Sequence, residues 1–231
     1  MLVILANRGD ETAAWLASRW QSHGAVLLTA ADLSASGWRY CLPPSGKSRA
    51  VVAGREVMTG EITCVLTRMS AVYEQELGHI VPTDRSYVAS EMTAFLLAWL
   101  SSLTCPVLNR PTPNCLSGPN WRSERWVRLA SRLGIAVTPV RRTVSHSSNG
   151  PASQSNCEVL VAGDQCFGNA APELNEQSRL LAKVAGADLL AVQFTGPESG
   201  SEFVSASLRP DLASPEVADA VLRYLLGRSA C

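Results

Sequence analysis

Two hydrophobic patterns alternate along the first 143 residues of this chain. Short runs of apolar residues predict buried strands, and longer segments with apolar residues every three or four positions predict helices. A strand, a helix and a second strand follow one another at the spacing of a βαβ unit, so we expect an open, parallel, Rossmann-like α/β domain. The predicted strands are residues 2–6, 25–28, 62–67 and 106–108, with a hairpin at 50–57, and the predicted helices are 13–20, 87–103 and 121–133.

A polar segment, SHSSNGPASQSN, occupies residues 145–156 and has the composition of a linker. Strands are again predicted beyond it, with two helices among them. We therefore expect an α/β domain over residues 1–143, a linker at 144–157 and a small α+β domain over 158–231. The elements predicted in this last part are strands at 159–162, 166–167, 189–194 and 203–206, and helices at 174–185 and 215–226.

The predicted helix at residues 121–133 is the clearest candidate for a binding surface. Arg125, Arg128 and Arg132 form a stripe beside its apolar face, and Arg122 lies near its start. Such a stripe is either a solvated face whose arginine stems cover apolar surface, or a binding surface for an acidic partner or peptide. The neutrality of the whole chain favours the first interpretation.

Composition excludes several classes of protein. The chain has 231 residues, 46% of them hydrophobic and 17% charged, which is typical of a globular protein. Its formal net charge is zero, whereas a nucleic-acid binder that tracks phosphates carries a basic excess. We expect no signal peptide, because the start reads as a strand without a charged segment before it. The longest apolar run, residues 95–100, is too short to span a membrane.

The seven cysteines are scattered and form no Cys-x-x-Cys pair. This usage is typical of a reducing cytoplasm, and the three histidines do not complete a zinc site. Cys166 and Cys115 are the candidates for a nucleophile, but neither has a histidine at a motif spacing. We therefore interpret most of the cysteines as structural.

The motifs of the first part, in their order and spacing, resemble the microviridin-type ATP-grasp peptide ligases, which mature ribosomally made peptides. The opening VILANRGDETAAWLASRW is similar to the start of the first domain of that family. The strand that ends at Arg68 resembles the family's aromatic-Arg-Arg strand end, although Met69 replaces the second arginine. Glu91, Asn109 and Pro111 also fit, as does the closing GIAVTP.

The second part resembles the far end of an ATP-grasp domain. EVLVAGDQCFG is similar to the family's hairpin, and LLAKVAGADLLAVQF is similar to the helix and strand that carry a metal-binding aspartate. FVSASLRPDL resembles the strand with the Glu-x-Asn metal site, and PEVADAVLRYL resembles the terminal helix. The resemblance therefore implies a pre-ATP-grasp domain followed by a remnant of an ATP-grasp domain.

The departures from the family concern its nucleotide and metal ligands. The position of the first ATP-binding lysine falls near Ser123, and the short linker at 144–157 stands where the family has its central subdomain. The metal-binding aspartate position falls on Gln193, and the Glu-x-Asn positions fall on Ser205 and Ser207. Neutral oxygens offset the charge of a magnesium ion poorly compared with carboxylates.

These departures predict a non-catalytic, ATP-grasp-like protein, a pseudoenzyme without cofactor or metal. We expect it to bind a peptide or a partner enzyme of a peptide-maturation or related biosynthetic pathway, as a cytoplasmic homodimer. Neither nucleic acid nor membrane is an expected partner. The residues expected to carry binding are Arg68, Glu91, Asn109, Arg122, Arg125 and Arg128.

Two other hypotheses remain open. The chain could be an ATP-dependent carboxylate-amine ligase that uses ATP and magnesium, with relocated ligands or with a second subunit that completes its site. Asp164, Asp188, Glu198 and Glu202 are then the candidate carboxylates. A structural dimer subunit without a ligand is the third hypothesis.

Overall fold

The computed structural model describes residues 1–42, 47–139 and 157–229. The chain divides into two compact units, one formed by Met1–Asn120 with Asp211–Cys231 and the other by Trp121–Pro210. Within the described residues, no helix combines the length and apolarity needed to cross a membrane. The predicted linker at 144–157 lies outside the described residues, apart from Cys157.

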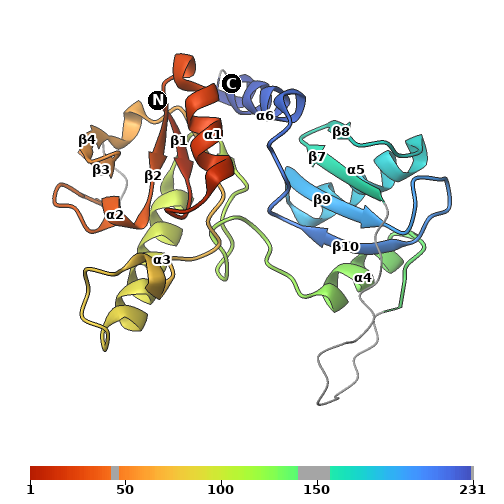
Figure 1. The fold of residues 1–231 in the computed structure, drawn as a ribbon, viewed down its shortest axis with the longest axis horizontal. Helices are drawn as coiled ribbons and strands as arrows, with labels where there is room; N and C mark the ends of the chain where they lie inside the picture. The colour runs from red at the N-terminus through yellow and green to blue at the C-terminus, as the bar shows by residue number, and fades with distance from the viewer. Residues whose placement is uncertain (43–46, 140–156, 230–231) are drawn as a thin grey trace. The chain divides into compact units, whose positions relative to one another are not determined.

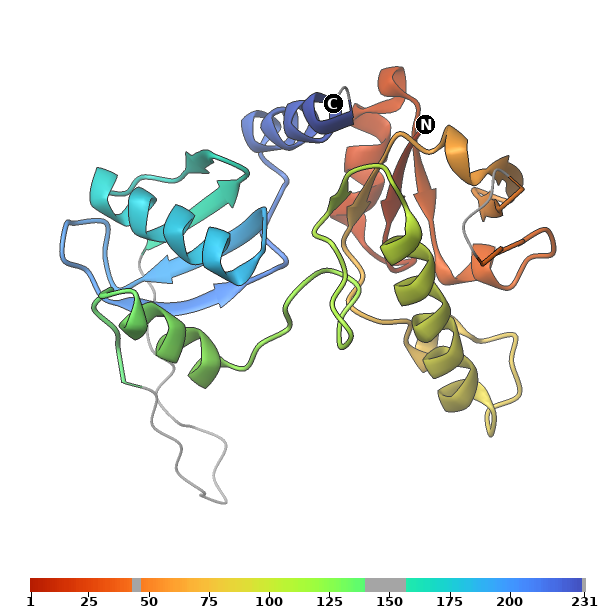
Figure 2. The same cartoon turned by 180° about the vertical axis from the view of Figure 1, so that it is seen from behind.

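The first unit is built on a parallel sheet with the strand order β2-β1-β5-β6 (Figure 1). Val3, Leu5 and Val65 point to one face and share a core with Leu96 and Trp99 of α3. Figures 1 and 2 show α1 on the opposite face. Both faces are therefore covered, as is usual for parallel strands that read as unbroken apolar runs. The strands are β1 (Leu2–Leu5), β2 (Ala25–Leu28), β5 (Cys64–Thr67) and β6 (Val107–Leu108), and the main helices are α1 (Glu11–Arg19) and α3 (Arg85–Ser102).

The predicted parallel domain is thus confirmed, and the structure adds short elements that the sequence pattern did not indicate. The hairpin is formed by β3 (Arg49–Val52) and β4 (Arg55–Met58). The additional elements are the helix α2 (Ala30–Leu33) and the 3-10 helices η1 (Gln21–His23), η2 (Thr59–Glu61) and η3 (Glu74–Glu76).

The second unit is an antiparallel sheet with the order β10-β9-β7-β8. Alternate side chains of its strands, such as Val159, Val192 and Phe203, share one core with Trp126 of α4 and Leu181 of α5. Both helices therefore cover the same face of the sheet, which Figure 2 shows from the helix side. The elements are α4 (Ser123–Arg132), β7 (Cys157–Ala162), β8 (Gln165–Phe167), α5 (Pro172–Ala185), β9 (Leu189–Phe194) and β10 (Phe203–Ser207).

The compact units do not follow the expected domain boundary at residue 143. Helix α4 belongs to the second unit because Trp126 and Ala130 are buried in the core of the antiparallel sheet. The terminal helix α6 (Pro215–Ser229) belongs to the first unit, where it contacts β5. Asp219 of α6 also forms an ion pair with Arg19 of α1 at 2.7 Å.

Candidate functional site

Three polar side chains lie in register across the antiparallel sheet. Gln193 of β9 is paired with Glu158 of β7 on one side and with Ser205 of β10 on the other. Because side chains alternate along a strand, these three point to the face opposite the core that contains Val159 and Val192. We call Glu158, Gln193 and Ser205 the polar ladder.

Hydrogen bonds connect the polar ladder from strand to strand. The Ser205 hydroxyl donates to Oε1 of Gln193 at 2.6 Å, and Nε2 of Gln193 donates to Oε2 of Glu158 at 3.4 Å. The amide therefore uses its oxygen on one neighbour and its nitrogen on the other. Ser207 lies two residues further along β10 on the same face, and its hydroxyl accepts a hydrogen bond from the Arg209 backbone N–H.

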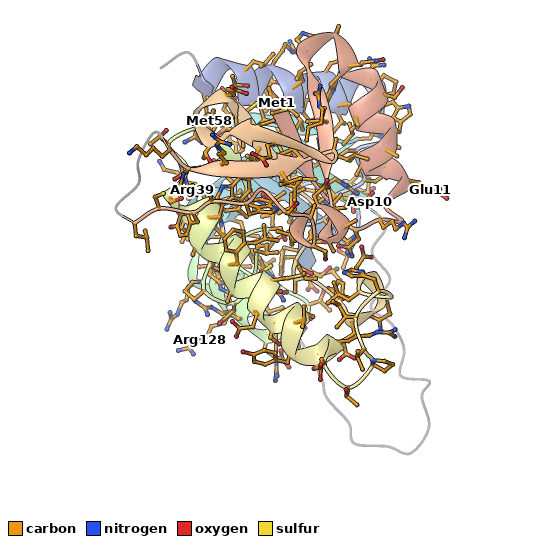
Figure 3. All side chains as sticks on the ribbon, turned by 90° about the vertical axis from the view of Figure 1, so that its left-hand side faces the viewer. Met1, Asp10, Glu11, Arg39, Met58 and Arg128 are labelled. Carbon is orange, nitrogen blue, oxygen red and sulfur yellow. The ribbon has the colours of Figure 1, made fainter. Side chains whose placement is uncertain are left out.

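A second group of side chains lines an open pocket of about 520 Å³ along α4. The guanidinium carbon of Arg125 lies 4.1 Å from the ring centroid of Trp121, and that ring packs against Trp126 with centroids 4.7 Å apart. Arg128 is exposed and projects from the helix in Figure 3. We call this pocket the α4 arginine groove, and its lining residues are Trp121, Glu124, Arg125, Arg128, Leu129 and Arg132.

The α4 arginine groove brings together two of the three predicted binding arginines of this helix, and Arg132 joins them. Arg122 is instead the residue that precedes the first turn, it is exposed, and it does not line the groove. Ser123, where the resemblance places a lysine, is the first residue of α4. The sequence pattern indicated the arginines but not Trp121, whose ring orients one of them.

The predicted binding residues of the first unit have different surroundings. Arg68 is buried, and its guanidinium donates two hydrogen bonds to the carboxylate of Asp10. Asn109 is buried and donates to the Ser117 carbonyl at 3.3 Å, whereas Glu91 is exposed on α3. Arg68 and Asn109 therefore have structural partners.

The close packing of Asn109 also constrains a glycine. Gly118 has a φ of +108°, and a Cβ at this position would lie 3.1 Å from the Cβ of Asn109. The loop after β6 therefore needs both the left-handed conformation and the absence of a side chain at this position.

Four of the described cysteines have the environments of structural thiols. Burial raises the pKa of Cys166, with nearby Arg179 opposing it, and the thiol donates to the Asn175 carbonyl at 3.4 Å. Burial likewise raises the pKa of Cys157 and raises the pKa of Cys105 to about 11. Cys115 is buried beside the Ser117 hydroxyl. A raised pKa keeps a thiol protonated and unreactive near neutral pH.

Comparison with known proteins connects this geometry to one fold. No family model and no curated protein matches the sequence. The macrocyclase MdnC of Microcystis aeruginosa MRC, bound with the precursor peptide MdnA, matches with a TM-score of 0.69 at 11% identity. The match covers 98% of this chain and 100% of that chain.

Two further solved structures have the same fold. The macrocyclase MdnB of the same organism matches with a TM-score of 0.65 at 17% identity, covering 97% of this chain and 98% of that chain. A RiPP-associated ATP-grasp ligase of Chryseobacterium gregarium, in complex with ADP and a leader and core peptide, matches with a TM-score of 0.66 at 10% identity, covering 98% and 96%. The fold is that of the microviridin-type ATP-grasp ligases. At these identities the likeness shows the fold alone, and the predicted fold class is confirmed.

The ATP-grasp fold raises the question of whether this chain can hold magnesium. Mg²⁺ takes an octahedral set of oxygen ligands in which carboxylates supply the charge. The positions that the resemblance assigns to these ligands hold Gln193, Ser205 and Ser207, and an amide N–H points at the one carboxylate in the row, Glu158. The residues present therefore do not fit a magnesium ion. Residues 1–42, 47–139 and 157–229 contain no cluster of three or more His, Cys, Asp or Glu side chains that could hold a metal, so the candidate relocated carboxylates do not form one.

Proposed function

We propose that this protein is a non-catalytic member of a peptide-maturation pathway that has the ATP-grasp fold and binds a peptide instead of activating one. The observation that carries the proposal is the polar ladder. Gln193 joins Glu158 and Ser205 by hydrogen bonds at the positions where the resemblance places magnesium ligands. A neutral amide N–H faces Glu158 where a magnesium site would have the metal ion, and the positive charge that a phosphate-binding site requires is therefore missing.

Charge explains why this replacement opposes catalysis. Acyl-phosphate formation concentrates negative charge on the transferred phosphoryl group, and catalysis depends on cations that neutralise it. Glu158 is the only charged member of the polar ladder, and its charge is negative. A polyphosphate beside an uncompensated carboxylate would be repelled.

The α4 arginine groove supports the binding half of the proposal. Arg125, Arg128 and Arg132 place positive charge beside the half-buried apolar surfaces of Trp121 and Leu129. Guanidinium groups bind carboxylates with two parallel hydrogen bonds, and the stacking on Trp121 holds one of them in place before a ligand arrives. We infer that an acidic peptide segment with an apolar side chain binds there. Of the proteins whose fold this chain shares, MdnC is bound with a precursor peptide, and the Chryseobacterium ligase is in complex with ADP and a leader and core peptide.

The test combines two titrations of the full chain. Calorimetry with magnesium-ATP is expected to show no saturable binding in the micromolar range. Fluorescence anisotropy with a labelled peptide that alternates glutamate and leucine is expected to show saturable binding, and the lysine-leucine peptide is expected to bind at least about tenfold more weakly. Micromolar magnesium-ATP binding that Glu158→Gln abolishes would contradict the non-catalytic proposal and favour the ligase. Equal binding of both peptides would contradict the binding proposal.

A further inference from the structure

The two edges of the antiparallel sheet differ in how the described residues cover them. Along β10, the segment that follows α4 pairs in parallel. The backbone N–H of Phe203 donates to the Ala136 carbonyl at 2.7 Å, and the N–H of Thr138 donates to the Phe203 carbonyl at 2.9 Å. At the other edge, β8 pairs only with β7 among the described residues (Figure 1). An edge strand presents backbone donors and acceptors that another chain can use.

The turn between β7 and β8 determines which backbone groups of β8 face outward. This turn has two residues and begins with Gly163, whose φ is +64°. In a two-residue hairpin the pair that flanks the turn, here Ala162 and Gln165, exchanges hydrogen bonds. The next pair, Val161 and Cys166, is therefore not hydrogen-bonded, and the N–H and C=O of Cys166 point away from β7.

An open groove of about 390 Å³ lies between this edge and α5. Strand β8 and its turn line one side, and Asn175, Glu176 and Arg179 of α5 line the other. The Cys166 thiol donates to the Asn175 carbonyl at 3.4 Å, which holds the strand against the helix. An extended peptide can add to a sheet at such an edge, with its side chains in the neighbouring groove. We call this feature the β8 groove.

The charges of the β8 groove are ordered along α5. Nη1 of Arg179 donates to the Asp164 carbonyl at 3.5 Å, so the guanidinium lies at the end of β8 that adjoins the turn. Glu176 lies about one helical turn before Arg179 on α5. The carboxylates of Asp164 and Glu176 are exposed, and neither forms an ion pair with a described residue.

This order of charges gives a bound strand a direction. Every strand pair in this sheet is antiparallel, and β8 runs away from its turn. A peptide that continues the antiparallel pattern therefore runs toward the turn, and its C-terminal end approaches Arg179. A guanidinium binds a carboxylate with two parallel hydrogen bonds, and Glu176 favours a basic side chain shortly before the end of the peptide.

We propose that the β8 groove binds the C-terminal end of an extended peptide as an added antiparallel strand. The peptide pairs with the outward N–H and C=O of Cys166, its terminal carboxylate binds Arg179, and a basic side chain lies near Glu176. The proposal does not depend on the proposed function, because β8 lies at the opposite edge of the sheet from β10, against which α4 packs.

Fluorescence anisotropy of the full chain tests the proposal with the labelled peptide Gly-Val-Lys-Val-Leu, which ends in a free carboxylate. The lysine is two positions before the end because alternate residues of a strand share a face. Saturable binding is expected. The same peptide with a C-terminal amide is expected to bind at least about tenfold more weakly, and a peptide with glutamate in place of lysine at least about threefold more weakly. Absence of saturable binding of the carboxylate peptide would overturn the proposal, as would equal affinity for the carboxylate and the amide.

Two variants of α5 locate the carboxylate. Arg179→Met is expected to weaken binding of the carboxylate peptide at least about tenfold and to remove its advantage over the amide. Lys183→Met is the matched control, because Lys183 is an exposed cation of the same helix that does not line the groove. This control is expected to stay within about twofold of the unchanged protein. Affinity that Arg179→Met leaves unchanged, or that both variants lower equally, would contradict the assigned site.

Methylation of the peptide's backbone nitrogens, one at a time, tests the strand pairing. The nitrogen that faces the Cys166 carbonyl loses its hydrogen bond when it is methylated, whereas the nitrogens of the adjoining residues point away from β8. Methylation is therefore expected to weaken binding at least about tenfold at one position and less than about threefold at the adjoining positions. Equal tolerance of methylation at every position would show that the peptide does not bind as an added strand.

Discussion

Arg68, which directly follows β5, donates two hydrogen bonds to the carboxylate of Asp10, which precedes α1. The Nε–Oδ2 distance is 2.9 Å, the Nη2–Oδ1 distance is 3.3 Å, and the two side chains are 9% and 6% exposed. Oδ1 of Asp10 also accepts the Ala13 backbone N–H and so caps the helix. One carboxylate therefore joins the segments that follow two neighbouring parallel strands to the start of α1.

Removing the arginine should leave the buried carboxylate of Asp10 without the guanidinium that faces it. Arg68→Met is expected to lower the free energy of unfolding by about 3–5 kcal/mol, measured by urea denaturation. Arg49→Met is the control, because the ion pair of Arg49 with Glu56 has the same 2.9 Å distance but is half exposed and is worth at most about 1 kcal/mol. Asp10→Asn in the Arg68→Met background should recover part of the loss, since asparagine still caps the helix. Equal effects of Arg68→Met and Arg49→Met would show that burial does not govern the first pair.

The Asp10–Arg68 pair shows which features of the fold can be predicted from the sequence and which cannot. The apolar run before Arg68 predicts a strand, and the sequence offers Asp10 or Thr12 as the cap of the helix after the first strand, because both signals are local. The pairing joins residues 58 positions apart and requires β1 and β5 to be neighbours in the sheet. The polar ladder also depends on strand pairing. Gln193 and Ser205 can be singled out from the sequence one by one, whereas Glu158 is recognised as their neighbour only from the strand register. For helices α4 and α6, the periodicity of apolar residues predicts that helices form, but it does not predict which of the two compact units they pack against.

The polar ladder predicts a gain of metal binding. Gln193→Asp replaces the amide with a second carboxylate opposite Glu158 and beside the Ser205 hydroxyl. Two carboxylates in register repel each other unless a cation lies between them. Terbium luminescence titration is expected to show an affinity at least about tenfold higher in the variant than in the unchanged protein. Gln165→Asp on β8 is the control for a general increase in negative charge. An equal increase in terbium affinity in both variants would show that the effect comes from added negative charge and not from the position of residue 193 in the polar ladder.

Partial burial of Cys105 predicts that the reactivity of its thiol and the stability of the fold depend on pH. The folded pKa of about 11 lies above the ordinary value of 9.0 because burial disfavours the thiolate. Between these values the folded state holds a proton that the unfolded state has lost, so the stability contributed by this group decreases as pH rises from about 9 to about 11. The decrease is expected to be smaller in Cys105→Ala, measured by urea denaturation across this range. Alkylation of Cys105 by iodoacetamide, followed by mass spectrometry, should remain slow at pH 8 and accelerate toward pH 11. Rapid modification at pH 8 would contradict the raised pKa of this thiol.

The α4 arginine groove makes the proposed peptide site testable residue by residue. Arg128→Glu reverses a charge that is exposed at the groove and is expected to weaken the glutamate-leucine peptide at least about tenfold at low salt. The difference between the variant and the unchanged protein should shrink as salt is raised, because screening acts on exposed charges. Arg55→Glu, an exposed arginine of β4 in the other compact unit, changes the net charge equally and should leave the affinity within about twofold.

Trp121→Leu separates the aromatic contribution of the groove from its charge. Leucine keeps an apolar side chain but removes the ring on which Arg125 stacks at 4.1 Å. The variant is expected to bind the glutamate-leucine peptide about two- to fivefold more weakly, in line with roughly 0.5–1 kcal/mol for a cation–π contact at an exposed site. Because Trp121 also packs against Trp126, thermal unfolding of the variant must be compared with the unchanged protein before affinities are compared. The charge of the groove and its stacked ring are the two features that support peptide binding there. If anisotropy titrations show that Arg128→Glu and Trp121→Leu both bind the peptide as tightly as the unchanged protein, the groove is not the peptide-binding surface.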